Sequence, residues 1–251
     1  MSYKTVFSKT DIQINILEQI RIAFESTANV AATLHGQRKI YQGAFGRRTS
    51  LFPSQKCCGA IPLESRLELA HAISLEQNPN VINYRSQALK ILLINEQYCF
   101  PDFLVQTKEG AYEVHEVKPS IASLSTDDLN RFAKLSDLLH SIDITFKLID
   151  HTDLPSESEI SQLLYWYQRG HRFNWNTLEI TYALRHLNFE EFYTSQQVYK
   201  TLESIGLKQE LADYLFFHKK IKLRSENMNS RKVYQYGKLS FYTSIWFSFL
   251  F

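Results

Sequence analysis

Apolar residues recur at helical spacing in three stretches of the first 150 residues. These stretches are 11–27, 63–81 and 126–142, and Thr126 is the expected N-cap of the last one. Short runs rich in β-branched and aromatic residues lie between and after them and predict strands within 81–94, 103–107, 111–118 and 144–150. Residues 36–59 are rich in Gly, Ser, Arg and Lys, which predicts a loop. This order of elements predicts an α/β fold with a mixed sheet flanked by helices.

The pattern becomes almost entirely helical in the last third of the chain. The polar stretch 151–161 contains a proline and is the expected linker. Helical runs follow, and then a basic segment that predicts two short strands, an order typical of a winged-helix domain. The sequence therefore predicts a helical arm with a basic loop (1–44), an α/β domain (45–150) and a winged-helix-like domain (151–251). The apolar residues 239–251 are too few for a transmembrane helix, so we expect no membrane partner.

Composition narrows the possible partners. The formal net charge is only +2 over 251 residues, so any contact with nucleic acid must come from local basic patches. Three cysteines and the absence of an N-terminal apolar segment indicate a protein of the reducing cytoplasm. The basic residues are explained equally well as parts of solvated loops or as contacts to phosphate groups. The candidate phosphate-binding residues are Arg47, Arg48, Lys56, Lys219, Lys220 and Lys222.

Candidate chemistry is concentrated in the stretch FPDFLVQTKEGAYEVHEVKPS, residues 100–120. Glu116 and Lys118 are two residues apart on a strand and share a face, whereas Val117 points the other way. Asp102 opens the preceding strand, and a hairpin can bring it beside Glu116. Two adjacent carboxylates repel each other, and Mg²⁺ or Mn²⁺ would relieve that repulsion. A divalent cation with a lysine beside it suits phosphodiester hydrolysis.

An upstream acid could complete this group, but the spacing leaves its identity open. Glu64, Glu68 and His71 lie on one face of the predicted helix, so either glutamate could reach the site. His115 faces away from Glu116 and is expected to be structural. The alternative interpretation is a set of weak surface ion pairs, because Glu-x-Lys is a common and unspecific pattern.

A family resemblance is carried by the ordered stretches LFPSQK, LESRLELAHAISLEQNPNVINYRSQ, FPDFLV and HEVKPS. Together they resemble TnsA, the endonuclease subunit of heteromeric transposases, which has a PD-(D/E)XK nuclease fold. The resemblance covers roughly residues 45–150, and the family also has a C-terminal winged-helix domain. It implies that the catalytic residues are Glu68, Asp102, Glu116 and Lys118, and that Glu68, Asp102, Glu116 and the carbonyl of Val117 hold the metal. The chain departs from the family at Gln87-Ala88, where Gln-Pro is frequent, and in its apolar C-terminus.

The resemblance also implies a reaction and partners. A TnsA-like subunit hydrolyses the 5′-side strand at each transposon end in double-stranded DNA, with Mg²⁺ or Mn²⁺. It works with a TnsB-like transposase and a TnsC-like AAA+ ATPase, in some systems guided by CRISPR effectors. We therefore expect a bacterial cytoplasmic protein that joins the nucleoid during transposition. Two alternatives stay open: a standalone restriction or repair nuclease, and an inactive DNA-binding or docking subunit.

Overall fold

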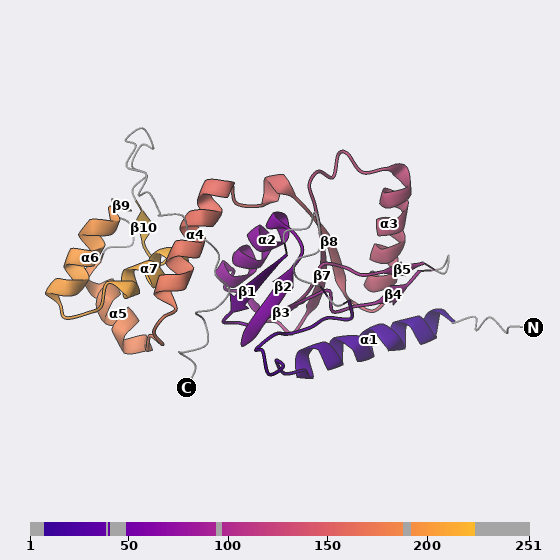
Figure 1. Ribbon diagram of the computed structural model, residues 1–251, viewed down its shortest axis with the longest axis horizontal. Coiled ribbons are helices and arrows are strands. Elements are labelled where there is room, and N and C mark those ends of the chain that lie inside the picture. The colour runs from indigo at the N-terminus through magenta and orange to yellow at the C-terminus, as the bar shows by residue number, and fades with distance from the viewer. Residues whose placement is uncertain (1–7, 39, 41–48, 94–96, 188–191, 224–251) are drawn as a thin grey trace, which may run out of the picture.

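The computed structural model describes residues 8–38, 40, 49–93, 97–187 and 192–223. At its centre is a four-stranded sheet in the order β3 (Val81–Ser86), β6 (Phe103–Thr107), β7 (Tyr112–Lys118) and β8 (Thr145–Asp150). β3 and β6 pair antiparallel, as do β6 and β7, whereas β7 and β8 are parallel (Figure 1). This confirms the predicted mixed sheet flanked by helices.

The two faces of the sheet pack against different helices because side chains alternate along each strand. Tyr84, Phe103 and Val117 point into a core shared with α2 (Arg66–Gln77). Leu104 and Val114 point into a second core, which is closed by α1 (Lys9–Glu25) and α3 (Thr126–His140). Since Glu116 and Lys118 alternate with Val117, they lie on the α1 and α3 side of the sheet.

Three boundaries differ from the sequence-based prediction. The predicted loop 36–59 contains β1 (Ser50–Ser54), which pairs with β2 (Gly59–Leu63) as an antiparallel hairpin. Leu63 therefore ends a strand, and α2 begins only after its N-cap Ser65. Thr126 is not the cap of α3, because the Ser125 side chain accepts the hydrogen bond from the Asp128 backbone N–H.

The remaining described strands are short. β4 (Ile91–Leu92) pairs with β5 (Tyr98–Cys99), and β9 (Phe192–Tyr193) pairs in parallel with β10 (Lys222–Leu223). The rest of the predicted basic C-terminal segment lies outside the described residues.

The last third of the described chain is helical, as predicted. A short 3₁₀ helix (His151–Asp153) leads into α4 (Glu157–Gly170), which begins inside the expected linker. α5 (Thr177–His186), α6 (Ser195–Ser204) and α7 (Glu210–Phe217) form a third core. α4 lies between these helices and the sheet (Figure 1), and its Trp166 packs against both neighbouring cores. No helix among the described residues is long and apolar enough to cross a membrane.

Candidate functional site

Three polar residues form a row across the end of the sheet. β6 pairs with β7 so that Phe103 is opposite His115, and one further step in this register places Asp102 opposite Glu116. β3 pairs with β6 so that Ser86 is opposite Phe103, which places Gln87 opposite Asp102. The Gln87 backbone N–H donates to the Asp102 carbonyl at 2.9 Å, which confirms this continuation. All three positions follow the alternation that faces α1 and α3.

Asp102 is the centre of the row. Its Oδ2 accepts a hydrogen bond from the Val117 backbone N–H at 2.8 Å, and its Oδ1 accepts one from Gln87 Nε2 at 3.3 Å. Burial, together with the charges of Glu116 and Glu68, raises the pKa of Asp102 to about 8. Two carboxylates therefore lie near enough to Asp102 for their charges to be felt, and an added cation would favour its ionised form.

Glu116 and Lys118 form an ion pair at the same place, with Lys118 Nζ 2.6 Å from Glu116 Oε1. The side chain of Glu116 is buried and that of Lys118 is 26% exposed, so the lysine can meet a ligand that arrives from solvent. Burial alone would lower the pKa of Lys118, but the charges of Glu116 and Asp102 more than offset it, and the pKa is raised. Lys118 is therefore a fixed positive charge at neutral pH.

Glu68 reaches the site from the first turn of α2. Its carboxylate accepts hydrogen bonds from the Glu64 backbone N–H at 2.8 Å and from Ser65 Oγ at 2.9 Å. Burial raises its pKa, and these hydrogen bonds partly offset the effect. The side chain of Glu64 instead pairs with Arg38. The structure therefore favours Glu68 over Glu64 as the acid near Asp102.

The backbone of Val117 is also turned towards Asp102. The N–H and C=O groups of one strand residue point to the same side, and the Val117 N–H already points to Asp102 Oδ2. β6 begins only at Phe103, so its ladder pairing with β7 ends at His115. The Val117 carbonyl therefore faces the Asp102 side beyond the end of that ladder, which suits its predicted role as a metal ligand.

Unsatisfied polar atoms gather around this row. Buried polar atoms are nearly always hydrogen-bonded, so exceptions point to strain or to an absent ligand. Gln87 is 1% exposed and has a positive φ of 49°. Arg38 and Arg131 lie beside the row, since their charges act on Glu68 and on Lys118 respectively. Within the described ranges, the buried side-chain atoms that lack a partner are Gln87 Oε1, Glu116 Oε2, Arg38 Nε and Arg131 Nε.

These atoms allow a test of whether a divalent cation fits. The donors are carboxylate, amide and carbonyl oxygens, the ligands that Mg²⁺ and Mn²⁺ prefer, and two of the oxygens have no other partner. The side chains are nevertheless not gathered as a finished metal site. No group of three or more His, Cys, Asp or Glu residues in the described part of the chain is arranged to hold a metal ion. Glu68 and Glu116 are instead bonded to Ser65 and Lys118. The chemistry of the oxygens fits a hard cation. Glu116 can offer its unpartnered Oε2 while Oε1 keeps Lys118, whereas Glu68 would have to exchange a hydrogen-bond partner to bind the cation.

The predicted DNA-binding residues are not brought to this row. The Lys56 ammonium donates to the Leu75 carbonyl at 2.7 Å and so caps the C-terminal end of α2, the end opposite to Glu68. Burial lowers its pKa to about 8. Lys219 and Lys220 are exposed just after α7, and Lys222 lies in β10. Arg47 and Arg48 lie outside the described residues.

His71 and His115 have a structural arrangement. His71 Nε2 is 2.9 Å from His115 Nδ1, and His115 Nε2 is 2.9 Å from Glu113 Oε2. Burial lowers the pKa of His71 to about 3, so it is neutral at physiological pH. The two rings fill the α2 side of the sheet, opposite to Glu116. This agrees with the expectation that His115 is structural, and His71 is buried beside it.

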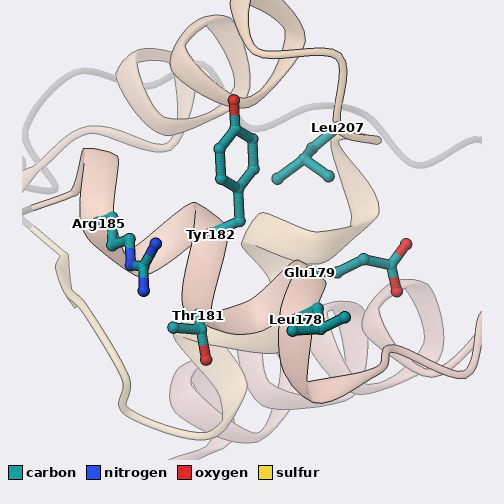
Figure 2. Close-up of a pocket in the computed structure, with 6 residues that line it drawn as sticks. All are labelled: Leu178, Glu179, Thr181, Tyr182, Arg185 and Leu207. Carbon is teal, nitrogen blue, oxygen red and sulfur yellow. The ribbon is translucent and has the colours of Figure 1, made fainter.

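A separate shallow hollow lies on α5. Its lining side chains come from α5 and, in the case of Leu207, from the segment after α6, and they include none of the predicted catalytic residues (Figure 2). The Glu179 carboxylate accepts a hydrogen bond from the Asn176 backbone N–H at 3.0 Å and so completes the N-cap of α5. The lining consists of Leu178, Glu179, Thr181, Tyr182, Arg185 and Leu207.

Comparison with known proteins does not add to this description. The chain matches no protein-family model, and a search of curated proteins finds no match. The assignment of the site therefore rests on its geometry and on the sequence resemblance. Two residues of the site, Gln87 and Arg131, were not singled out as functional from the sequence. The β3–β6 register would have revealed Gln87, whereas only helix packing reveals Arg131.

Proposed function

We propose that this protein is a Mg²⁺-dependent DNA endonuclease, a TnsA-like subunit of a heteromeric transposase that hydrolyses the 5′-side strand at transposon ends. The observation that carries the proposal is the convergence of Asp102, Glu116 and Lys118 at one end of the sheet. The unpartnered Glu116 Oε2 lies in the same group. The sequence resemblance supports the same function through the same residues.

Each of these residues has a separate role in phosphodiester hydrolysis. Asp102, Glu116, Glu68 and the Val117 carbonyl would hold the cation, which when bound withdraws charge from the phosphate and makes water more acidic. Lys118 places its positive charge beside the same point, where it stabilises negative charge on the phosphate oxygens and orients the attacking water. Glu116 keeps the lysine in position through their 2.6 Å contact. Departure of the 3′ oxygen leaves a 5′-phosphate and a 3′-hydroxyl.

The helical part of the chain supports the same proposal in a coarser way. α5, α6 and α7 with the β9–β10 pair are compatible with the winged-helix-like domain of a TnsA-like subunit. Partners of this kind would be a TnsB-like transposase, which cuts and joins the other strand, and a TnsC-like AAA+ ATPase. Double-stranded DNA would be the substrate.

The experiment that tests the proposal is a strand-specific cleavage assay. A DNA that carries the ends of the element is incubated with Mg²⁺, the neighbouring transposase and ATPase, and either the wild-type chain or Lys118→Ala. We expect the variant to lose the 5′-side cut by at least about a hundredfold, the scale for removal of one preorganised charge, and to keep the 3′-side cut. Lys134→Ala, at an exposed position of α3, is the matched control.

Three outcomes separate the alternatives. Loss of only the 5′-side cut supports the transposase subunit. Cutting by the wild-type chain without any partner protein would favour a standalone nuclease. Unchanged cutting by Lys118→Ala would contradict the catalytic assignment and leave a DNA-binding or docking role.

A further inference from the structure

Arg131 occupies an unusual place on α3. The helix packs on the sheet through a ridge at four-residue spacing, in which Leu135 and Leu139 are fully buried. Arg131 is the next residue of this ridge towards the N-terminus of the helix. A cationic side chain therefore continues a buried apolar ridge, at the end where α3 meets Lys118.

The guanidinium of Arg131 and the ammonium of Lys118 share one aromatic surface. Arg131 Cζ is 4.9 Å and Lys118 Nζ is 5.6 Å from the centre of the Phe132 ring, and Phe132 itself is buried. The charge of Arg131 also acts against the positive charge of Lys118. Like charges are placed side by side at a cost unless an anion lies between them.

The partners of Arg131 leave part of its charge unused. Nη2 contacts Asp128 Oδ1 at 3.0 Å, in an ion pair whose side chains are 40% and 39% exposed. Nε is buried and has no hydrogen-bond partner. A buried donor without an acceptor is unfavourable, so the protein neighbours of Arg131 leave part of its hydrogen-bonding capacity unused. Nε itself is buried, but the side chain as a whole is 40% exposed, so the guanidinium can be approached from solvent.

We propose that Arg131 binds a phosphate group of the DNA strand at the carboxylate site through its guanidinium, next to Lys118. This inference rests on the proposed nuclease function and adds a substrate-binding residue to it. Arginine presents planar, directional donors that match phosphate oxygens, and a phosphate placed here meets two cations. The carboxylates favour a cation, and Arg131 and Lys118 attract an anion in addition to their partners Asp128 and Glu116, so a metal–phosphate complex is favourable to both groups.

The test is DNA binding as a function of salt. A labelled DNA duplex is titrated with the full-length chain, with Ca²⁺ in place of Mg²⁺ so that cleavage does not interfere, and fluorescence anisotropy gives Kd. The variants are Arg131→Gln, which removes the charge, and Arg131→Lys, which keeps the charge but lacks the planar set of guanidinium N–H donors. Arg21→Gln is the control, because Arg21 is a surface residue of α1 whose partners are Glu18 and Glu25. Thermal unfolding of each variant shows whether it is folded.

We expect Arg131→Gln to weaken binding about tenfold and to reduce the salt slope of log K by about one, as for loss of one phosphate contact. Arg131→Lys should keep the slope and weaken binding less. The loss should persist in EDTA, which separates a direct phosphate contact from an effect through the cation. If Arg131→Gln does not fold, Arg131→Lys decides, and wild-type affinity in that variant overturns the proposal.

Failure of this inference differs from failure of the proposed function. A wild-type chain that binds DNA while Arg131→Gln binds with the same Kd and slope overturns only the role of Arg131. A wild-type chain that binds no duplex DNA at any salt concentration overturns the role of Arg131 together with the nuclease proposal.

Discussion

At the scale of single residues, Asp102 links the stability of the protein to pH. Its pKa is raised from 3.8 to about 8 by burial, Glu116 and Glu68. Between these two values the folded chain holds a proton that the unfolded chain has released. The free energy of unfolding therefore falls as pH rises from about 4 to about 8. A bound divalent cation would remove this loss, because it stabilises the ionised form.

Replacement of Asp102 by asparagine tests this linkage. In EDTA, we expect Asp102→Asn to be only slightly more stable than the wild type at pH 5, near the start of this range. At pH 9 the variant should be more stable by about 1 kcal/mol or more, since each pKa unit corresponds to about 1.4 kcal/mol. Urea unfolding at both pH values measures the difference. Mg²⁺ at pH 9 should stabilise the wild type and leave the variant unchanged.

The matched control is Asp137→Asn, at an exposed position of α3. It should shift the unfolding curve equally at pH 5 and pH 9. Parallel stability curves for the wild type and Asp102→Asn across this pH range would show that Asp102 titrates normally, and the argument for a cation site at this carboxylate would then fail.

Residue types and spacing were sufficient to predict Asp102, Glu116 and Lys118 as one group. The two-residue period of a strand fixes the common face of Glu116 and Lys118, and the hairpin fixes their distance from Asp102. Helical spacing could not choose between Glu64 and Glu68, which lie on one face of the same predicted helix. Gln87 and Arg131 depend on strand register and on helix packing, and neither is local information.

At the scale of elements, the start of α3 matters most because this helix carries Arg131 and Phe132. The N-cap was predicted as Thr126, but Ser125 has that role. Ser125 Oγ accepts from the Asp128 backbone N–H at 3.1 Å and donates to Asp128 Oδ2 at 2.8 Å. Both residues are good caps by type, so only the backbone path distinguishes them.

Two alanine substitutions distinguish these caps. Ser125→Ala should lower the free energy of unfolding by about 1 kcal/mol, because the Asp128 N–H loses its acceptor. Thr126→Ala should change it by only a few tenths of a kcal/mol, since alanine is a good helix former at the first helical position. Urea unfolding compares them directly. An equal or larger loss in Thr126→Ala would mean that α3 begins one residue later.

The β1–β2 hairpin was not predicted because its local sequence does not show which side chains tertiary packing buries. Its strands SLFPS and GAIPL each contain a proline, and glycine opens the second, which is a composition typical of loops. They form strands because Phe52, Ile61 and Leu63 bury their side chains in the core beside α2. Tertiary burial overrides local preference there, whereas the long periodic helices and the strand at 112–118 were predictable from pattern alone.

At the scale of the whole molecule, α4 joins the sheet to the helical C-terminal part. Tyr167 donates from its hydroxyl to the Pro53 carbonyl at 3.0 Å and accepts from the Gln55 N–H at 2.9 Å, so α4 holds the β1–β2 hairpin. Phe217 of α7 lies in the same core as Tyr167. The two parts therefore share buried side chains, and we expect them to unfold together.

Gly170 tests this expectation because α4 and α7 meet closely there. A Cβ at Gly170 would lie 2.6 Å from the Tyr214 nitrogen and 2.7 Å from its Cα, both backbone atoms that cannot move aside cheaply. Gly170→Ala should therefore cost about 1–3 kcal/mol, as overpacking does, and push α7 away from α4. In scanning calorimetry the wild type should unfold in one transition whose calorimetric and van't Hoff enthalpies agree, and the variant should unfold earlier in two separable steps.

Gly110→Ala is the matched control, because its φ of 82° is strained for alanine but no atom lies within 4 Å of the new Cβ. It should lower Tm slightly and keep a single transition. A Gly170→Ala variant that melts in the same single transition as the wild type would mean that the close approach at Gly170 is not what couples the sheet to the helical C-terminal part.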